Sequence, residues 1–175
     1  DFEMLKQKYG KGPLALAAKA NELEDVKTFI SNGENVNQVA NQGNTALIYA
    51  SWKGHKDIVV ELLKSPDLDL GKQNDNGDTA LMMVVDGGRN IDVVRYLCEL
   101  PDIDLGIKNN EDKTALNIAI FRRETRGGLA GPMAQVIRDA ERRITGSKKK
   151  SKRKKSKKYK KKSKKSKKKK TKSKK

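Results

Sequence analysis

The feature that most limits the fold of this chain is a segment that recurs with a fixed period. The triplet Thr-Ala-Leu begins at Thr45, at Thr79 and again at Thr114, so the copies start 34 and 35 residues apart. In the two central copies a second apolar run follows, over residues 58–63 and 91–97. A repeat of this length indicates stacked helix pairs, because one unit has too few apolar residues for a core and buries them against its neighbours.

Irregular copies are found at both ends of the array. Residues 13–20 align with the start of the second copy, with Pro13 in place of the threonine. A first helical turn tolerates proline, since the missing N–H would have no partner there. Phe2, Leu5 and Tyr9 fall at helical spacing, which predicts a short helix that shields the first copy.

The last copy is interrupted by the glycine-rich segment 127–131, which we interpret as a spacer loop. From Pro132 the pattern predicts a final helix with one apolar face, which includes Met133 and Ile137, and with charged residues opposite. An element of this kind is typical of the end of an array, because only one of its sides packs against a repeat.

The central copies resemble the ankyrin repeat, whose motif reads Thr-Pro-Leu-His-x-Ala, followed by Gly-His and a Val-Val-x-Leu-Leu helix. The matching residues in the second copy are Thr45-Ala-Leu, Gly54-His55 and the run Ile-Val-Val-Glu-Leu-Leu at 58–63. The resemblance implies an all-α fold, a solenoid of helix pairs with projecting β-turn or hairpin loops. We expect a cap segment at 1–12, a repeat domain at 13–146 with copies at about 13–42, 43–76, 77–111 and 112–145, and a tail at 147–175.

The charge distribution separates the tail from the repeats. Of the 40 Lys and Arg residues, 21 lie between Ser147 and Lys175, a stretch without Asp or Glu. The remaining 19 basic and 22 acidic residues leave positions 1–146 with a net charge of −3, against +18 for the whole chain. The basic character therefore belongs to the tail, which has too few apolar residues for a core and is expected to be disordered.

The sequence lacks the residue combinations used for catalysis or metal binding. His55 is the only histidine, and the resemblance implies that it makes hydrogen bonds within a turn. Cys98, the only cysteine, excludes an internal disulfide and a multi-thiolate metal site, and its apolar neighbours favour burial. With no triad, ligand cluster or phosphate loop, we expect a protein that is not an enzyme and has no metal or cofactor.

The resemblance implies a protein-binding surface on the concave side, formed by the hairpin tips and the ends of the first helices. By alignment its residues are Asn41, Gln42, Asn44, Trp52, Lys53, Asp75, Asn76, Asp78, Asp86, Asn110, Glu111, Lys113, Phe121 and Arg122. Trp52 and Phe121 are the candidate hot spots, because an aromatic ring buries a large area with little loss of rotamer freedom. The alternative is that each ring rests on a neighbouring repeat or covers an array end. The acidic members of this surface suit a basic or neutral protein better than nucleic acid.

The tail has the composition of a polyanion-binding segment, with nucleic acid, anionic lipid or an acidic protein as candidate ligands. The residues assigned to this role are Lys148, Lys149, Lys150, Lys152, Arg153, Lys154 and Lys155. Basic clusters of this kind also act as nuclear import signals, and a purely solubilising extension is the alternative. We expect an intracellular location, in the nucleus or cytoplasm, or in a virion, because Lys/Ser tails on small repeat proteins resemble those of large DNA viruses.

These observations favour a protein–protein interaction adaptor, in which the solenoid holds a protein partner while the tail binds nucleic acid or another polyanion. The alternative is a nucleic-acid-binding or packaging protein, including a structural component of a viral particle, that acts mainly through the tail. No apolar run approaches the roughly 18 residues of a membrane-spanning helix, so we expect no transmembrane segment. The sequence assigns no oligomeric state.

Overall fold

A computed structural model describes residues 2–125 and 128–146, and this part of the chain contains helices and no strand. The helices are α1 (Phe2–Tyr9), α2 (Pro13–Ala20), α3 (Leu23–Ser31), α4 (Ala46–Lys53), α5 (Lys56–Leu62), α6 (Ala80–Gly87), α7 (Ile91–Glu99) and α8 (Ala115–Thr125), with the short 3₁₀ helix η1 at Asn41–Gly43. Residues 130–146 are also helical. The predicted all-α class is confirmed.

Three sequence predictions concern the C-terminal part of the chain, where the described residues end. The final helix begins at residue 130, two residues before Pro132, which therefore lies within its first turn. Part of the predicted spacer loop, including Gly127, and all seven predicted polyanion-binding residues of the tail lie outside the described residues. The chain divides into two units with the boundary after residue 138, and the second unit is described only over residues 139–146. In that short helical stretch, Arg142 pairs with Asp139 at 3.4 Å.

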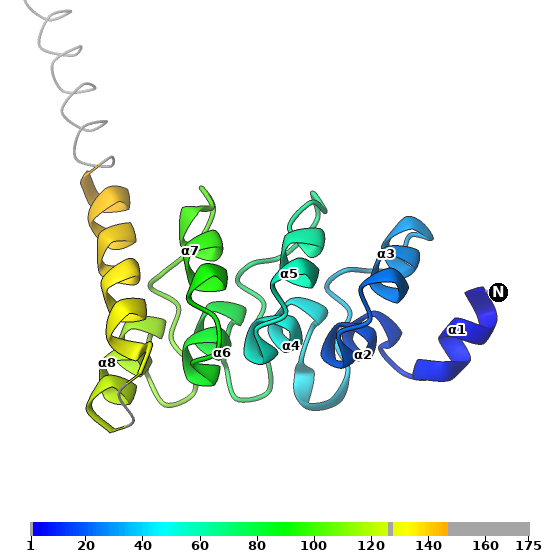
Figure 1. The fold of residues 1–175 in the computed structure, drawn as a ribbon, viewed down its shortest axis with the longest axis horizontal. Helices are drawn as coiled ribbons and strands as arrows, with labels where there is room; N and C mark the ends of the chain where they lie inside the picture. Colours follow the sequence, from blue (N-terminus) through cyan, green and yellow to red (C-terminus); the bar gives the residue numbers. More distant parts are fainter. Residues whose placement is uncertain (1, 126–127, 147–175) are drawn as a thin grey trace, which may run out of the picture. The chain divides into compact units, whose positions relative to one another are not determined.

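The first unit is built from two rows of helices. The first helices of the repeats, α2, α4, α6 and α8, pack side by side in one row, and the second helices, α3, α5 and α7, form the other row (Figure 1). Within each repeat the two helices also pack against each other, as α2 does with α3 and α4 with α5. Each pair therefore has neighbouring pairs against which its apolar face is buried.

The recurring threonine begins the first helix of each regular repeat. The Oγ1 atom of Thr45 accepts a hydrogen bond from the backbone N–H of Ile48 at 3.2 Å, and Thr79 accepts one from Met82 at 3.4 Å. These N–H groups have no partner within the helix, so the threonine hydroxyl stabilises the helix start by about 1 kcal/mol. In α8 the cap is reciprocal, because Asn117 Oδ1 also accepts from the Thr114 N–H at 3.0 Å.

The core of the first unit runs along the interface between the two rows. Ile58 and Leu62 of α5 and Val93 of α7 are fully buried, and Leu47 of α4 is 2% exposed. Each such side chain contributes about 1.5–3 kcal/mol on burial. Cys98 is buried as the sequence predicts.

The N-terminal helix covers the first repeat. The ring centroids of Phe2 and Tyr9 lie 5.8 and 5.9 Å from that of Phe29, which is fully buried. The Tyr9 hydroxyl also donates a hydrogen bond of 2.6 Å to Asp25 of α3. The helix α1 thus shields the Phe29 side chain at this end of the described array.

The hairpin tips of successive repeats are joined by hydrogen bonds. At one junction the Asn74 carboxamide donates to Asn44 Oδ1 at 3.0 Å, and at the next the Asn109 carboxamide donates to Asp78 Oδ1 at 2.8 Å. Backbone bonds accompany them, from the Asp75 N–H to the Gln42 carbonyl and from the Asn110 N–H to the Asn76 carbonyl, at 3.1 and 3.0 Å. These contacts fix the register of one repeat on the next.

Two glycines make this close approach of the tips feasible. Gly43 and Gly77 have φ angles of 68° and 77°, in the left-handed region, and a Cβ on Gly77 would lie 2.7 Å from the Asn110 backbone nitrogen. Asp112 occupies the same position in the last tip with φ 61°. Within the described residues no later tip stacks on it, so a side chain is tolerated there.

We expect Gly77→Ala to lower the free energy of unfolding by at least about 2 kcal/mol, since it combines a left-handed backbone with a steric clash. The matched control is Gly88→Ala. Gly88 has φ 62° but no atom within 4 Å of the added Cβ, so the cost should be only about 1 kcal/mol. Urea unfolding followed by circular dichroism measures both values. Equal losses would show that the tips do not need this close contact.

Candidate functional site

A hollow lies over the first-helix row and the tips of the third and fourth repeats. It has a volume of about 410 Å³. Its lining residues come from three first helices and two tips: Trp52, Asn76, Asp78, Met83, Asp86, Asn109, Glu111, Lys113, Ile118, Phe121, Arg122 and Thr125. A hollow with both apolar and charged walls is the usual form of a binding site.

The apolar part of the hollow follows from the register of the first helices. Met83 and Ile118 each stand four residues after the capping threonine, and Trp52 and Phe121 stand seven residues after it. Positions 4 and 7 share one face of a helix, so both kinds of side chain point to the same side of the row. Phe121 is 56% exposed, whereas Trp52 is half-buried. Phe121 therefore offers the larger uncovered apolar surface.

At the Trp52 end of the hollow, α4 and α6 are in close contact at a glycine. Gly87, at the end of α6, lies directly against the Trp52 carbonyl oxygen, so that any side chain at this position would collide with it. Lys53 then covers the indole ring, with its Nζ atom 4.4 Å from the ring centroid. The half-buried state of Trp52 thus results from close helix contact on one side and from a lysine on the other.

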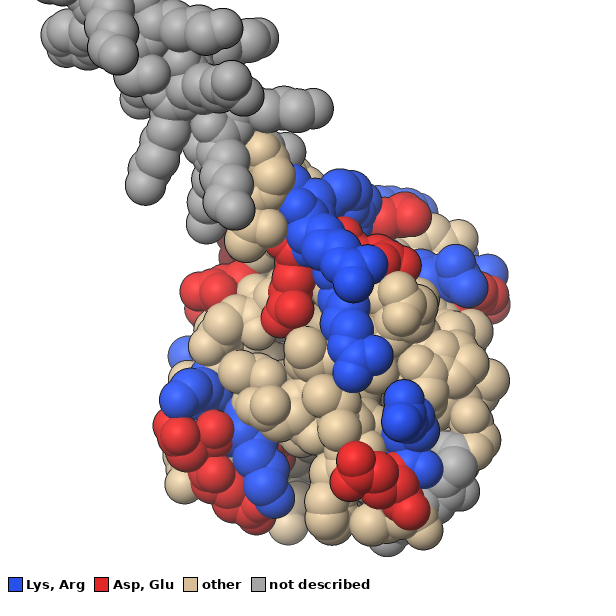
Figure 2. Space-filling model, turned by 90° about the vertical axis from the view of Figure 1, so that its left-hand side faces the viewer, with Lys and Arg blue, Asp and Glu red and all other residues tan. Residues whose placement is uncertain are grey.

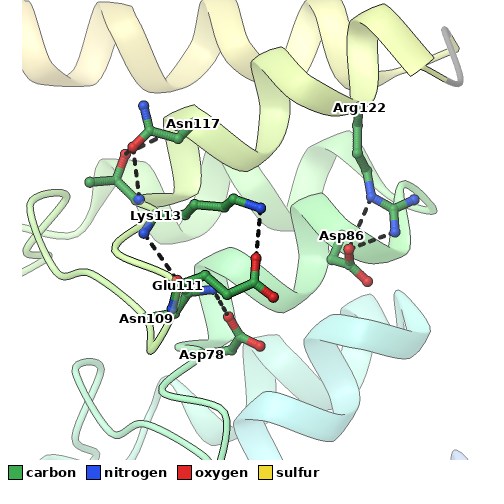
Figure 3. A network of polar contacts seen from close by, with 8 residues as sticks. Asp78, Asp86, Asn109, Glu111, Lys113, Asn117 and Arg122 are labelled. Atoms are coloured by element: carbon green, nitrogen blue, oxygen red, sulfur yellow. Dashed lines mark hydrogen bonds and ion pairs between the residues drawn. The ribbon is translucent and has the colours of Figure 1, made fainter.

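Two ion pairs cross or border the hollow (Figure 3). Arg122 of α8 places its guanidinium Nη2 and Nε atoms 2.6 and 3.0 Å from one oxygen of Asp86 on α6. Lys113 Nζ lies 2.6 Å from Glu111 in the same tip and 5.3 Å from the centroid of the Phe121 ring. Each cation of the hollow is therefore already paired with a carboxylate, although exposed pairs of this kind contribute at most about 1 kcal/mol each.

Asp78 is the carboxylate that differs from the other two. Its oxygen accepts a hydrogen bond from the neutral carboxamide of Asn109, and no cation of the described residues pairs with it. Burial raises the pKa of Asp78 above its ordinary value, and the negative charges of Asp86 and Glu111 raise it further, while the bond from Asn109 lowers it. The lining of the hollow therefore contains one negative charge that neither of its two cations, Lys113 and Arg122, pairs with.

His55 has the environment of a structural residue. Burial lowers the pKa of its imidazole, a hydrogen bond to the Lys19 backbone opposes this shift, and the charges of Lys53 and Arg89 add to it. Within the described ranges, no three His, Cys, Asp or Glu side chains are grouped as metal ligands. In the same part of the chain, no helix has the length and apolar character needed to cross a membrane.

The stacked helix pairs, capping threonines and joined tips agree with the comparison to known families. A family model described as ankyrin repeats (3 copies) matches residues 1–71 and 60–126, which together exceed half of the chain. The chain belongs to the ankyrin-repeat family. Repeats of this family generally mediate protein–protein interactions.

Several curated relatives share part of the ankyrin array. Rat osteoclast-stimulating factor 1 is 39% identical over 61 residues, which cover 35% of this chain and 28% of the relative. The mouse B-cell lymphoma 3 protein homolog is 36% identical over 83 residues, or 47% and 18% of the two chains. The human photoreceptor ankyrin repeat protein is 32% identical over 80 residues, or 44% and 18%. The matched segment spans less than a third of each of these relatives.

The ankyrin array brings eight of the fourteen predicted surface residues to the hollow. These are Trp52, Asn76, Asp78, Asp86, Glu111, Lys113, Phe121 and Arg122.

The other six predicted surface residues lie outside the hollow. Four of them, Asn41, Gln42, Asp75 and Asn110, are exposed on the tips, and Lys53 lies over the Trp52 ring. The assignment of Asn44 needs correction. It is 5% exposed and both ends of its carboxamide are bonded, to Asn74 and to the Asn41 carbonyl, so it is not available to a partner.

Four lining residues were not predicted from the sequence: Met83, Asn109, Ile118 and Thr125. The helical register could have identified Met83 and Ile118, because they precede the aligned positions of Asp86 and Phe121 by three residues. Asn109 stands five residues before its capping threonine, as Asn74 does, but neither residue was singled out from the sequence. On the face shown in Figure 2, basic side chains lie next to acidic ones, in agreement with the small net charge of positions 1–146.

We expect Asp78→Asn to raise the melting temperature at pH 7. A carboxyl whose pKa is raised in the folded state costs stability above that pKa, and the cost disappears as pH falls through it. An asparagine keeps the acceptor for Asn109 without the charge. The gain should therefore shrink as the pH falls from the raised pKa of Asp78 to the ordinary Asp value, and it should be absent at lower pH.

The control for this measurement is Asp75→Asn, which removes one charge from the same tip. Asp75 is exposed, so its replacement should change the melting temperature less than Asp78→Asn at pH 7. Equal changes would mean that the net charge of the tip, and not the burial of Asp78 beside Asp86 and Glu111, causes the effect.

Proposed function

We propose that this chain is a non-enzymatic adaptor, whose ankyrin array holds a protein partner at the hollow while the tail binds nucleic acid or another polyanion. The observation that carries the proposal is Phe121, a large apolar side chain that is 56% exposed inside a hollow of about 410 Å³. An exposed ring next to charged groups is typical of a binding hot spot, because a partner that covers it excludes water from both.

The rest of the hollow supports a protein ligand. Its walls combine apolar side chains with paired charges and carboxamides, and such mixed composition matches the centre and rim of protein interfaces. The glycine contact at Trp52 and the reciprocal cap of α8 hold the two aromatic positions on rigid helices. A rigid site loses little conformational entropy on binding.

The first test is affinity capture with the full chain and a Phe121→Ala variant, compared by quantitative mass spectrometry. The control is Tyr96→Ala, which removes an aromatic ring of 39% exposure from the second helix α7, outside the hollow. We expect the proteins bound by the unaltered chain to be depleted with Phe121→Ala, by tenfold or more for a hot spot worth about 2 kcal/mol. If Phe121→Ala retains the bound proteins and Tyr96→Ala loses them, the binding surface lies on the second-helix row and not at the hollow.

The second candidate function is nucleic-acid binding or packaging through the tail, and the observation that favours it is the gathering of 21 of the 40 basic residues in 147–175. Binding by Lys and Arg to phosphates releases counterions, so its affinity falls steeply with salt, by about 10³-fold or more between 50 and 200 mM for six phosphate contacts.

We expect the full chain to bind duplex DNA and single-stranded RNA with this salt dependence, and a chain that ends at Gly146 to lose the affinity. Fluorescence anisotropy across a salt series measures both. Equal binding by the shortened chain would show that the repeats contact the nucleic acid. If both activities are found, Phe121→Ala should leave the nucleic-acid affinity unchanged, which separates the adaptor from the packaging protein.

A further inference from the structure

The charges of the hollow are not balanced, and the imbalance is located at one residue. Arg122 is paired with Asp86 and Lys113 with Glu111, each at 2.6 Å, whereas among the described residues the Asp78 carboxylate is bonded by the neutral amide of Asn109 and by no cation. The hollow therefore has one negative charge in excess. An anionic ligand group would first have to separate an existing pair, whereas a cationic group would not.

The preceding repeat shows that the junction hydrogen bond does not require the negative charge of Asp78. Asn44 occupies the same position in the preceding repeat, one residue before the capping threonine, and accepts the equivalent bond from Asn74. The two junction bonds measure 3.0 Å to Asn44 and 2.8 Å to Asp78. An amide oxygen at position 78 would therefore accept the same bond, and the junction does not account for the charge.

The charge is also retained at a cost to stability. Burial raises the pKa of Asp78, the bond from Asn109 lowers it, and the charges of Asp86 and Glu111 raise it again. The net rise means that ionisation of Asp78 is less favourable in the folded protein than in an unfolded chain. The cations nearby, Lys113 and Arg122, are held by those same two carboxylates. A charge that is unnecessary for the junction and unfavourable in the free protein is what a site for a cation contains before its ligand arrives.

Building on the proposed function, we propose that the hollow binds a Lys or Arg side chain of the protein partner, with the cation at Asp78 and the aliphatic part of the side chain against Phe121. Both residues line the same hollow, and the Phe121 ring leaves more than half of its surface free. Long cationic side chains bind in this way, since the methylene groups cover apolar surface while the charge meets a carboxylate.

The test is a selection of short random peptides displayed against the full chain. Peptides that also bind the Phe121→Ala chain are removed first, because this variant carries the same tail and so eliminates ligands of the tail. We expect the remaining peptides to share a Lys or Arg next to an apolar residue. Each one is then compared with a neutral version, in which citrulline replaces Arg or acetyllysine replaces Lys.

Fluorescence anisotropy gives the dissociation constants for a double-mutant cycle. We expect the neutral peptide to bind about tenfold more weakly than the cationic one, and Asp78→Asn to remove this difference, as for a close charge pair across an interface. Asp75→Asn, on the same tip but outside the hollow, should preserve it. Because Asp78→Asn is expected to stabilise the protein, weaker binding by this variant would not reflect unfolding.

Two results would overturn the inference, and they differ from failure of the proposed function. If Phe121-dependent peptides share no cation, or if Asp78→Asn leaves the preference for the cationic peptide intact, the hollow binds proteins without recognising a cation at Asp78. If no peptide depends on Phe121, the proposed binding surface fails together with the inference.

Discussion

The structure depends on the contact between successive repeats, because no single helix pair of this chain can bury its apolar face alone. Apolar burial drives the stacking but does not define its register, since the hydrophobic effect has no direction. The hydrogen bonds between tips supply that direction. Asn74 and Asn109 each donate to the preceding tip, while their Oδ1 atoms accept two backbone N–H groups of their own tip. One side chain type thus builds each turn and joins it to its neighbour.

This division of tasks leaves a few positions free to vary. The residue before the capping threonine is Asn44, Asp78 or Lys113 in successive repeats, and the residue seven positions after it is Trp52, Asp86 or Phe121. These side chains lie where tips and first helices meet, and their differences create the hollow and its charge. The helices and caps that carry them are nearly the same in each repeat. A repeat fold can therefore change its ligand without changing its core.

Much of the architecture could be predicted because its causes are local in the sequence. The period, the threonine caps and the left-handed glycines each follow from residues within a few positions of one another, and they define the helix pairs. The site was predicted less completely. Asn44 aligns with Asp78 and was assigned to the same surface. It is nevertheless buried, because Asn74 of the next repeat donates a hydrogen bond to its side-chain oxygen. Alignment places equivalent residues at equivalent positions, but it does not show which neighbour covers them.

The sequence by itself determined the family, the helical class and the concentration of basic charge in the tail, since these follow from spacing and composition. Only the tertiary structure decided which aligned residues share a hollow and how their charges pair. Arg122 meets Asp86 across 36 positions, and Asn109 meets Asp78 across 31. Such pairs depend on the distance and register between two stacked repeats, which result from the packing of all their side chains together. The excess charge at Asp78 is visible only once those pairs have been assigned.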